Sequence, residues 1–319
     1  MQLVEGLDNV SGPYPNAVIT IGNFDGVHKG HQALFNVLRD KAVRLDGTSV
    51  VVTFEPHPAR VVGGKTRLPL ITMYEQKIEL IAASGVDVCL CIPFTKAFAV
   101  VSAHDFVNDI LVDGLGMKAI VVGRDYAFGK NREGDVDFLR KYAQIRGYEV
   151  ICLEEVPSAD GLPRISSTII RETIGRGDMK TAFDLLGRYY QIRGRVVSGR
   201  GRGARSLGFP TANLELVDEL CPPSGVYAVY VEYQSERYPG VANIGYSPTF
   251  DDHLFTVEVH ILDFDLQING RDIKVDFVKR LREEVRFPGI EELKAQIRKD
   301  IEQARGILCK RRMINHVNP

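Results

Sequence analysis

Two histidines spaced three residues apart stand in a glycine-rich segment near the start of the chain. Residues 22–31 read GNFDGVHKGH and separate a β-rich run from a helical pattern. A helix start offers unpaired N–H groups to phosphate, glycine permits close backbone approach, and imidazole can donate hydrogen bonds to phosphate oxygens. The segment therefore predicts a phosphate site in which His28 and His31 stabilise the charge on a departing pyrophosphate.

A competing interpretation makes these histidines surface residues and the glycines a plain turn. A zinc site would need a third or fourth ligand, and no such spacing surrounds His57, the nearest candidate. The position of the segment between a strand and a helix favours the phosphate site, because ligands bind at the carboxyl edge of a parallel sheet.

A second segment, RISSTIIR at residues 164–171, stands at the start of another predicted helix. Its hydroxyl groups and backbone amides converge there, and Arg171 supplies a cation for a triphosphate. Taken alone, the segment is explained by Ser166 or Ser167 as a simple N-cap and Arg171 as a solvated charge. Together with the first segment it predicts a second phosphate-binding helix start.

A third segment, GRGRGARSLGFPTAN at residues 199–213, combines glycine with arginine. Gly201 and Gly203 permit a tight loop around an anion, although a solvated or nucleic-acid-binding loop has the same composition. Thr211 and Asn213 lie two residues apart, so in an extended segment their oxygens face one side. They could then orient Mg²⁺ bound to ATP.

A carboxylate stands in the β pattern VEVHIL at residues 257–262. Strand periodicity places Glu258 and His260 on one face. A solvent-exposed strand edge explains a single glutamate without further chemistry. The functional interpretation is general-base removal of the proton from a hydroxyl group whose oxygen attacks a γ-phosphorus.

The elements that must position these residues change in character along the chain. Up to about residue 155, short β-rich apolar runs alternate with helical patterns, one at residues 31–45 and one that Ser102 can cap. The alternation predicts a doubly wound, Rossmann-like parallel α/β sheet with strands buried on both faces. The predicted strands are 17–21, 49–54, 86–92, 119–122 and 148–153.

From about Gln191 the pattern changes to glycine-rich turns between alternating β segments, which predicts a small antiparallel barrel or sandwich. The segments 227–233, 255–262 and 273–278 are its clearest strands. A terminal helix at residues 290–307 is expected to dock on it. The buried stripe of that helix consists of Leu293, Ile297, Ile301 and Ala304.

A chain of 319 residues exceeds what one core comfortably organises, so two domains are expected, at residues 1–187 and 188–319. A helical stretch at 167–186 would bridge the two halves.

The net charge of −1 offers no global field for nucleic acid, so any anion must be bound locally. Apolar runs such as 86–94 are too short to span a bilayer, and the N-terminus lacks a signal pattern, so we expect a cytoplasmic protein without a membrane partner. The five cysteines lack zinc-site spacing. Cys89 and Cys91 are expected to pack in the core as reduced thiols.

GNFDGVHKGH and RISSTIIR together resemble the adenylyltransferase module of the bacterial bifunctional riboflavin kinase/FMN adenylyltransferase family, within the HxGH nucleotidyltransferase superfamily. The resemblance implies direct attack of FMN phosphate on the α-phosphorus of ATP, without a covalent enzyme intermediate. Asn23 and Asp25 would shape the first loop, and the segment GRDYAFG at 123–129 resembles a further family loop. The nucleotide-binding residues implied in this half are Asn23, Asp25, Gly26, His28, Gly30, His31, Asp125, Ser166, Ser167 and Arg171.

GRGRGARSLGFPTANLEL, GVYAVYV, GVANIGYSPTF and VEVHILDF resemble the riboflavin kinase domain of the same family and occur in its order. This resemblance implies a six-stranded barrel, with Gly201 and Gly203 near the nucleotide, Thr211 and Asn213 at Mg²⁺-ATP and Glu258 as catalytic base. The implied substrates are riboflavin, FMN and ATP, the implied cofactor is Mg²⁺, and no nucleic acid partner is expected.

Two alternative hypotheses stay open at this point, one of them a narrower enzyme and the other a protein of a different class. One is that a single module works and the other is retained for structure. The other is a flavin-responsive binding protein that recognises nucleotides without turning them over. The sequence favours the enzyme, because one chain combines the two predicted phosphate-binding segments with Thr211, Asn213 and Glu258.

Overall fold

The computed structural model describes residues 1–62, 68–154, 164–197, 208–216, 218–246 and 255–314. The chain divides into two compact units, Met1–Ser167 and Thr168–Pro319. The expected domain boundary at residues 187 and 188 stays a prediction.

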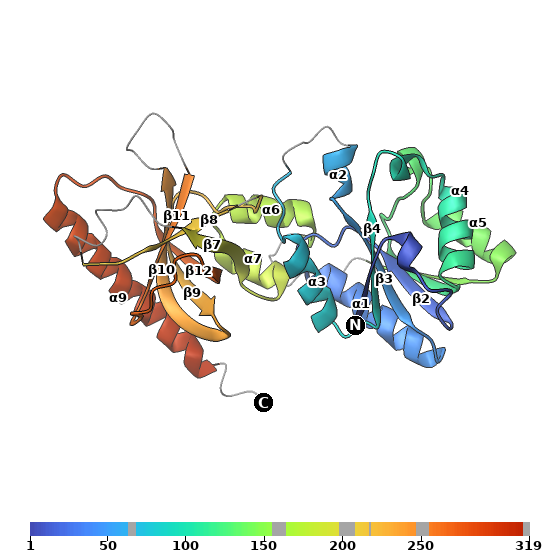
Figure 1. Cartoon of the computed structure of the whole chain (residues 1–319), viewed down its shortest axis with the longest axis horizontal. Helices are drawn as coiled ribbons and strands as arrows, with labels where there is room; N and C mark the ends of the chain where they lie inside the picture. Colours follow the sequence, from blue (N-terminus) through green and yellow to red (C-terminus); the bar gives the residue numbers. More distant parts are fainter. Residues whose placement is uncertain (63–67, 155–163, 198–207, 217, 247–254, 315–319) are drawn as a thin grey trace. The chain divides into compact units, whose positions relative to one another are not determined.

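The first unit is built on a six-stranded sheet in which all neighbouring strands are parallel (Figure 1). The order β1-β4-β3-β2-β5-β6 places β3 and β4 on one side of β2, and β5 and β6 on the other. The doubly wound arrangement is therefore confirmed. The strands are β1 (Gln2–Glu5), β2 (Ala17–Ile21), β3 (Ser49–Glu55), β4 (Val88–Pro93), β5 (Met117–Gly123) and β6 (Glu149–Leu153).

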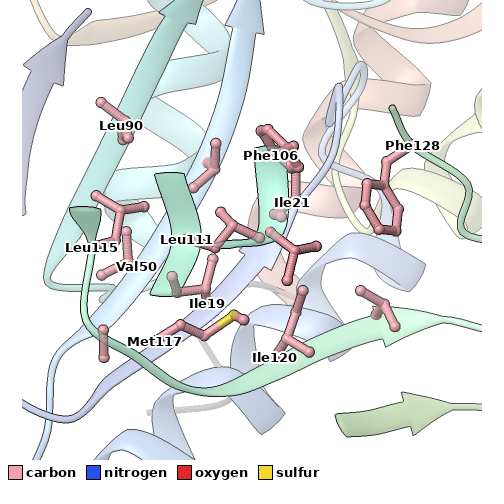
Figure 2. Packing of buried hydrophobic residues seen from close by; sticks show 14 of the residues in the cluster. Ile19, Ile21, Val50, Leu90, Phe106, Leu111, Leu115, Met117, Ile120 and Phe128 are labelled. Carbon is pink, nitrogen blue, oxygen red and sulfur yellow. The ribbon is translucent and has the colours of Figure 1, made fainter. Parts of the chain in front are cut away.

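Alternate strand residues feed two cores on opposite faces of the sheet. On β2, Ile19 belongs to one core together with Phe106 and Leu111, whereas Val18 belongs to the other together with Phe35. Figure 2 shows the first of these cores, with the side chains of Phe106 and Leu111 among strand residues. Burial on both faces explains why the strands read as continuous apolar runs.

Helices cover both faces of this sheet. Ser102 Oγ accepts a hydrogen bond from Asp105 N at 3.0 Å, so the predicted cap is confirmed, although the helix continues with the wider turns of a π-helix. The helices are α1 (Lys29–Arg44), α2 (Pro58–Val61), α3 (Tyr74–Ala83), α4 (Ala103–Asp105), η3 (Phe106–Gly114) and α5 (Val136–Arg146), with short 3₁₀ turns η1 (Leu7–Asn9), η2 (Phe98–Val100) and η4 (Lys130–Arg132).

The helical stretch predicted at residues 167–186 is two helices, α6 (Ser167–Gly175) and α7 (Met179–Leu186). Gly177 adopts φ +77°, a left-handed conformation that ends the first helix. Asp178 then caps the second by accepting a hydrogen bond from Thr181 N at 3.0 Å. The predicted stretch is therefore helical, and glycine and a capping aspartate divide it into two helices.

The second unit contains a closed six-stranded barrel in the order β10-β11-β8-β7-β12-β9 (Figure 1). Every strand pair in it is antiparallel, and the six strands that the resemblance implies are confirmed. Closure leaves no open sheet edge. The strands are β7 (Tyr190–Val197), β8 (Ala212–Glu215), β9 (Gly225–Tyr233), β10 (Glu236–Tyr246), β11 (Phe255–Ile261) and β12 (Asp272–Arg282).

Alternation along the strands divides the barrel residues between an interior and an outer surface. Tyr227 and Phe277 are fully buried, with ring centroids 5.2 Å apart. The terminal helix α9 (Ile290–Ile314) packs Ala304 and Leu308 against Ala228 on the outer surface. The predicted docking of this helix on the barrel is therefore confirmed.

We expect Leu111→Ala to lower the free energy of unfolding of the first unit by about 2–5 kcal/mol, because it removes a fully buried side chain from the core in Figure 2. Urea unfolding followed by circular dichroism measures the change. Val43→Ala, at a side chain that is 81% exposed, is the control and should shift it by less than about 0.5 kcal/mol. Equal effects of the two substitutions would contradict this packing.

Candidate active sites

The loop at residues 22–28 leaves the carboxyl end of β2, where the strand order reverses. β2 pairs with β3 on one side and with β5 on the other, and the chain crosses to opposite faces from this point. Ligands of open α/β sheets bind in the crevice outside such a reversal. The predicted position of the glycine-rich loop, between a strand and the start of α1, is confirmed.

Asp25 holds this loop against the segment that precedes α3. The residue is 4% exposed, and its carboxylate accepts hydrogen bonds from Ile71 N at 3.0 Å and Thr72 N at 3.1 Å. Gly26 N donates to Thr72 Oγ1 at 3.0 Å. Two backbone donors satisfy a buried carboxylate, so Asp25 shapes the loop.

The same loop carries strained backbone. Phe24 adopts φ +49° and Val27 adopts φ +37°, and a positive φ is a genuine outlier for a β-branched residue. Gly26, with φ +87°, lies so near Ile71 that a Cβ would stand 3.1 Å from Ile71 Cγ2. Strain of this kind concentrates at ligand sites, where surrounding structure enforces it.

The two histidines meet at the first turn of α1. His28 is the N-cap residue, and its Nδ1 accepts a hydrogen bond from His31 N at 3.3 Å. Their rings stack with centroids 3.5 Å apart and planes 18° apart. A Cβ on Gly30 would stand 3.2 Å from the His28 ring, so glycine permits this packing. Because Nδ1 of His28 accepts, Nε2 is the ring nitrogen that carries the proton in the neutral imidazole.

The segment at residues 164–167 lies against this loop. Ser167 Oγ donates to the carbonyl oxygen of Asp25 at 2.9 Å, and Arg164 pairs with Asp125 at 3.0 Å. Ile165 Cγ2 lies 3.9 Å from the position of a Cβ on Gly30. Residues 164–167 of the second segment therefore lie against the glycine-rich loop within the first unit.

The remaining residues implied for this half occupy varied positions. Asn23 is exposed, and its carbonyl oxygen accepts from Thr53 Oγ1 at 3.4 Å. Ser166 is half-buried just before α6. Arg171 lies on α6 beyond Ser167 and belongs to the second unit, so its part in phosphate binding stays a prediction.

In the barrel, strand register brings polar residues together around Glu258. On β11 it is the Cα partner of Asn213 on β8 and of Asn243 on β10. Cross-strand partners share a face, with Cβ atoms about 5 Å apart. Val257, the preceding residue, is 1% exposed, so it points into the barrel and the three polar residues point outward. Thr211 directly precedes β8, while Gly201 and Gly203 lie outside the described residues.

Burial raises the pKa of Glu258 above the ordinary value of a glutamate. Desolvation is the cause, and among the described residues no hydrogen bond or ion pair to this carboxylate offsets it. A half-buried carboxylate held in this way is a stronger base than an exposed one, as general-base chemistry requires.

Two residues of these sites were missed by sequence reasoning. Thr72 supports Asp25 from a segment without a chemical motif, and Asn243 flanks Glu258 from the neighbouring strand. The Asn within GVANIGYSPTF was a polar residue in a β pattern, which is the signal that could have pointed to it.

In the described part of the chain, no group of three or more His, Cys, Asp or Glu side chains is arranged to hold a metal ion. Cys89 belongs to a buried core, and burial raises its pKa to about 12, so it stays a protonated thiol. The hydroxyl of Thr211 and the amide oxygen of Asn213 are hard donors of the kind that Mg²⁺ accepts.

The fold and these two sites define an enzyme class with a nucleotidyltransferase unit and a phosphotransferase barrel. A family model described as FAD synthetase matches residues 13–169, and one described as riboflavin kinase matches residues 186–308. The chain belongs to the bifunctional riboflavin kinase/FMN adenylyltransferase family, whose two activities the two matches cover in turn.

Curated relatives carry that name. One from Pseudomonas fluorescens is 43% identical over 96% of this chain and 98% of its own length. Another from Escherichia coli strain K12 is 40% identical over 96% of this chain and 97% of its own.

A solved structure named as a macrolide-efflux protein from Streptococcus pneumoniae has 32% identity and a TM-score of 0.85, and it covers 96% of this chain and 99% of that one. Its name describes an activity that differs from those of the two family models. Within the described ranges, no helix has the length and apolar character that crossing a bilayer requires.

We expect Glu258→Gln to raise the free energy of unfolding of the second unit at neutral pH, because a neutral amide avoids the cost of desolvating the carboxylate. Because the pKa of Glu258 is higher in the folded than in the unfolded protein, the folded form binds more protons at pH values between the two. The free energy of unfolding of the wild type therefore falls as pH rises through this interval. The advantage of Gln should vanish below about pH 4, where both side chains are neutral.

Urea unfolding at pH 4 and pH 7 measures the difference. Glu215→Gln is the matched control, since Glu215 is an exposed glutamate on the neighbouring strand β8. It should change the unfolding free energy by less than about 0.5 kcal/mol. If Glu258→Gln is less stable than the wild type at pH 7, contacts in the folded protein offset the desolvation of the carboxylate and the prediction is wrong.

Proposed function

We propose that this chain carries out both reactions of its family, each in its own site. Riboflavin and ATP give FMN and ADP in the barrel, and FMN and ATP give FAD and pyrophosphate at the glycine-rich loop of the first unit. The proposal rests on one observation in each site. In the barrel, strand register sets Glu258 beside Asn213, and in the first unit His28 and His31 stack at the start of α1.

In the adenylyl transfer, a phosphate oxygen of FMN attacks the α-phosphorus of ATP. A new P–O bond forms, the bond from the α-phosphorus to the bridging oxygen breaks, and pyrophosphate leaves with the electron pair. His28 donates through Nε2 to phosphate oxygen, and His31 lies stacked beside it at the positive end of α1. The Asp25 contacts hold the loop, so these donors are in place before the charge develops.

In the kinase reaction, Glu258 takes the proton of the terminal ribityl hydroxyl as that oxygen attacks the γ-phosphorus. The new P–O bond forms, the bond to the β-phosphate oxygen breaks, and ADP leaves. The raised pKa of Glu258 supports this role, because the carboxylate accepts a proton more readily than an ordinary one.

Thr211 and Asn213 would hold the Mg²⁺ that accompanies ATP. Their oxygens suit a small hard cation, which prefers a few protein oxygens together with nucleotide phosphates and water. When bound, the ion neutralises phosphate charge. The substrates are the small molecules riboflavin, FMN and ATP, and we propose the cytoplasm as the place where they are met.

Substitutions should separate the two activities. We expect His28→Ala combined with His31→Ala to abolish FAD formation and to leave FMN formation unchanged, because the kinase site draws on the other unit. Glu258→Gln should slow FMN formation by about a hundredfold to ten-thousandfold and spare the adenylylation of added FMN. Chromatography of the flavins after incubation with ATP and Mg²⁺ measures both products.

Equal loss of both activities in either variant would refute the separate sites. Full activity of Glu258→Gln on riboflavin would remove this residue from the role of base. Glu215→Gln serves again as the control for a glutamate on the adjacent strand.

Riboflavin phosphorylation should also depend on the ionisation of Glu258. The base must be deprotonated, so the rate at saturating ATP is expected to fall as pH drops through its pKa. Because burial raises that pKa, the midpoint should lie above the ordinary glutamate value of about 4.3. Adenylylation of FMN by the same preparation should lack this limb, and an identical acid limb in both reactions would contradict the assignment.

A further inference from the structure

His260 lies beside the residues that the proposed kinase site uses for the nucleotide. It follows Glu258 by two residues on β11, so the two side chains share one face of the strand. Its Nδ1 lies 2.7 Å from the carbonyl oxygen of Pro210. Because a carbonyl oxygen only accepts, Nδ1 carries the ring proton and donates this hydrogen bond.

This bond extends the pairing of β8 with β11 beyond the end of the strand. The described ladder stops at the partners Ala212 and Val259, so Thr211 stands just outside it. Pro210 has no N–H group with which to continue the ladder. The side chain of His260 therefore anchors the residue that immediately precedes Thr211.

A ring contact acts on the same stretch of chain. Phe209 meets His260 edge to face, with centroids 5.9 Å apart and planes at 87°. The whole His260 residue is half-buried. Two residues in a row before Thr211 are thus tied to the strand that carries Glu258.

We propose that His260 is a positioning residue for the riboflavin kinase reaction. Its Nδ1–H holds the Pro210 carbonyl so that the Thr211 hydroxyl stands beside Asn213, in register with Glu258, when the nucleotide binds. The inference rests on the proposed function of the barrel. His260 acts through Thr211 and touches none of the reacting atoms.

Three substitutions separate the hydrogen bond from the ring contact. His260→Asn keeps an N–H donor at the position of Nδ1, His260→Gln moves the donor one bond further out, and His260→Phe keeps the ring edge without a donor. We expect Gln and Phe to raise the KM for ATP in riboflavin phosphorylation by roughly tenfold, the effect of one lost hydrogen bond, and Asn to stay within about twofold of wild type.

The KM for riboflavin and the adenylylation of added FMN should be unchanged in all three variants. A readout independent of activity is the ¹⁵N NMR spectrum of the imidazole ring in the free protein, which should show His260 protonated at Nδ1 at neutral pH. Thermal unfolding checks that the barrel is intact, and if the Phe variant fails to fold, the Asn and Gln pair still decides.

A wild-type KM for ATP in the Gln and Phe variants, an Asn variant as impaired as Gln, or a ring protonated at Nε2 alone would each overturn the proposal. Failure of the proposed kinase function can be told apart from failure of the role of His260. In the first case Glu258→Gln would leave riboflavin phosphorylation intact, whatever the effect of the His260 variants.

Discussion

A carboxylate withdrawn from water needs other donors, and three carboxylates of this protein differ in how far the described residues supply them. Asp25 accepts hydrogen bonds from two backbone N–H groups, and Asp300 accepts hydrogen bonds from Nε and Nη2 of Arg282. Glu258 has no such bond from the described residues, and burial raises its pKa. The compensated carboxylates hold a loop and a helix in place, whereas the uncompensated one is left able to take a proton.

The two units bring the side chains of their candidate sites together in different ways. A parallel sheet collects ligand groups at its carboxyl edge, so the loop after β2 and the 164–167 segment meet although they are far apart in sequence. A closed antiparallel barrel sets side chains by register, so Glu258 faces neighbours on both adjacent strands. The net charge of −1 offers no global field for an anion, so any anion must be bound through local donors.

Sequence patterns predict the strands best where burial on both faces restricts the residue types to apolar ones. The strands at 17–21 and 49–55 read as continuous apolar runs because both of their faces are covered. β1 was not predicted, since its four residues include one buried position only. The break at Gly177 and the supports from Thr72 and Asn243 were missed for a shared reason, because each depends on turn geometry or on partners distant in the chain, which local periodicity does not encode.

We propose that one chain splits ATP at two different bonds in two sites. This can be tested by incubating the protein with riboflavin and Mg²⁺, in parallel with ATP labelled at the γ-phosphorus or at the α-phosphorus. The γ-label should enter FMN and be carried into FAD, whereas the α-label should enter FAD and never FMN. An α-label in FMN, or flavins without label from either ATP, would refute the two sites.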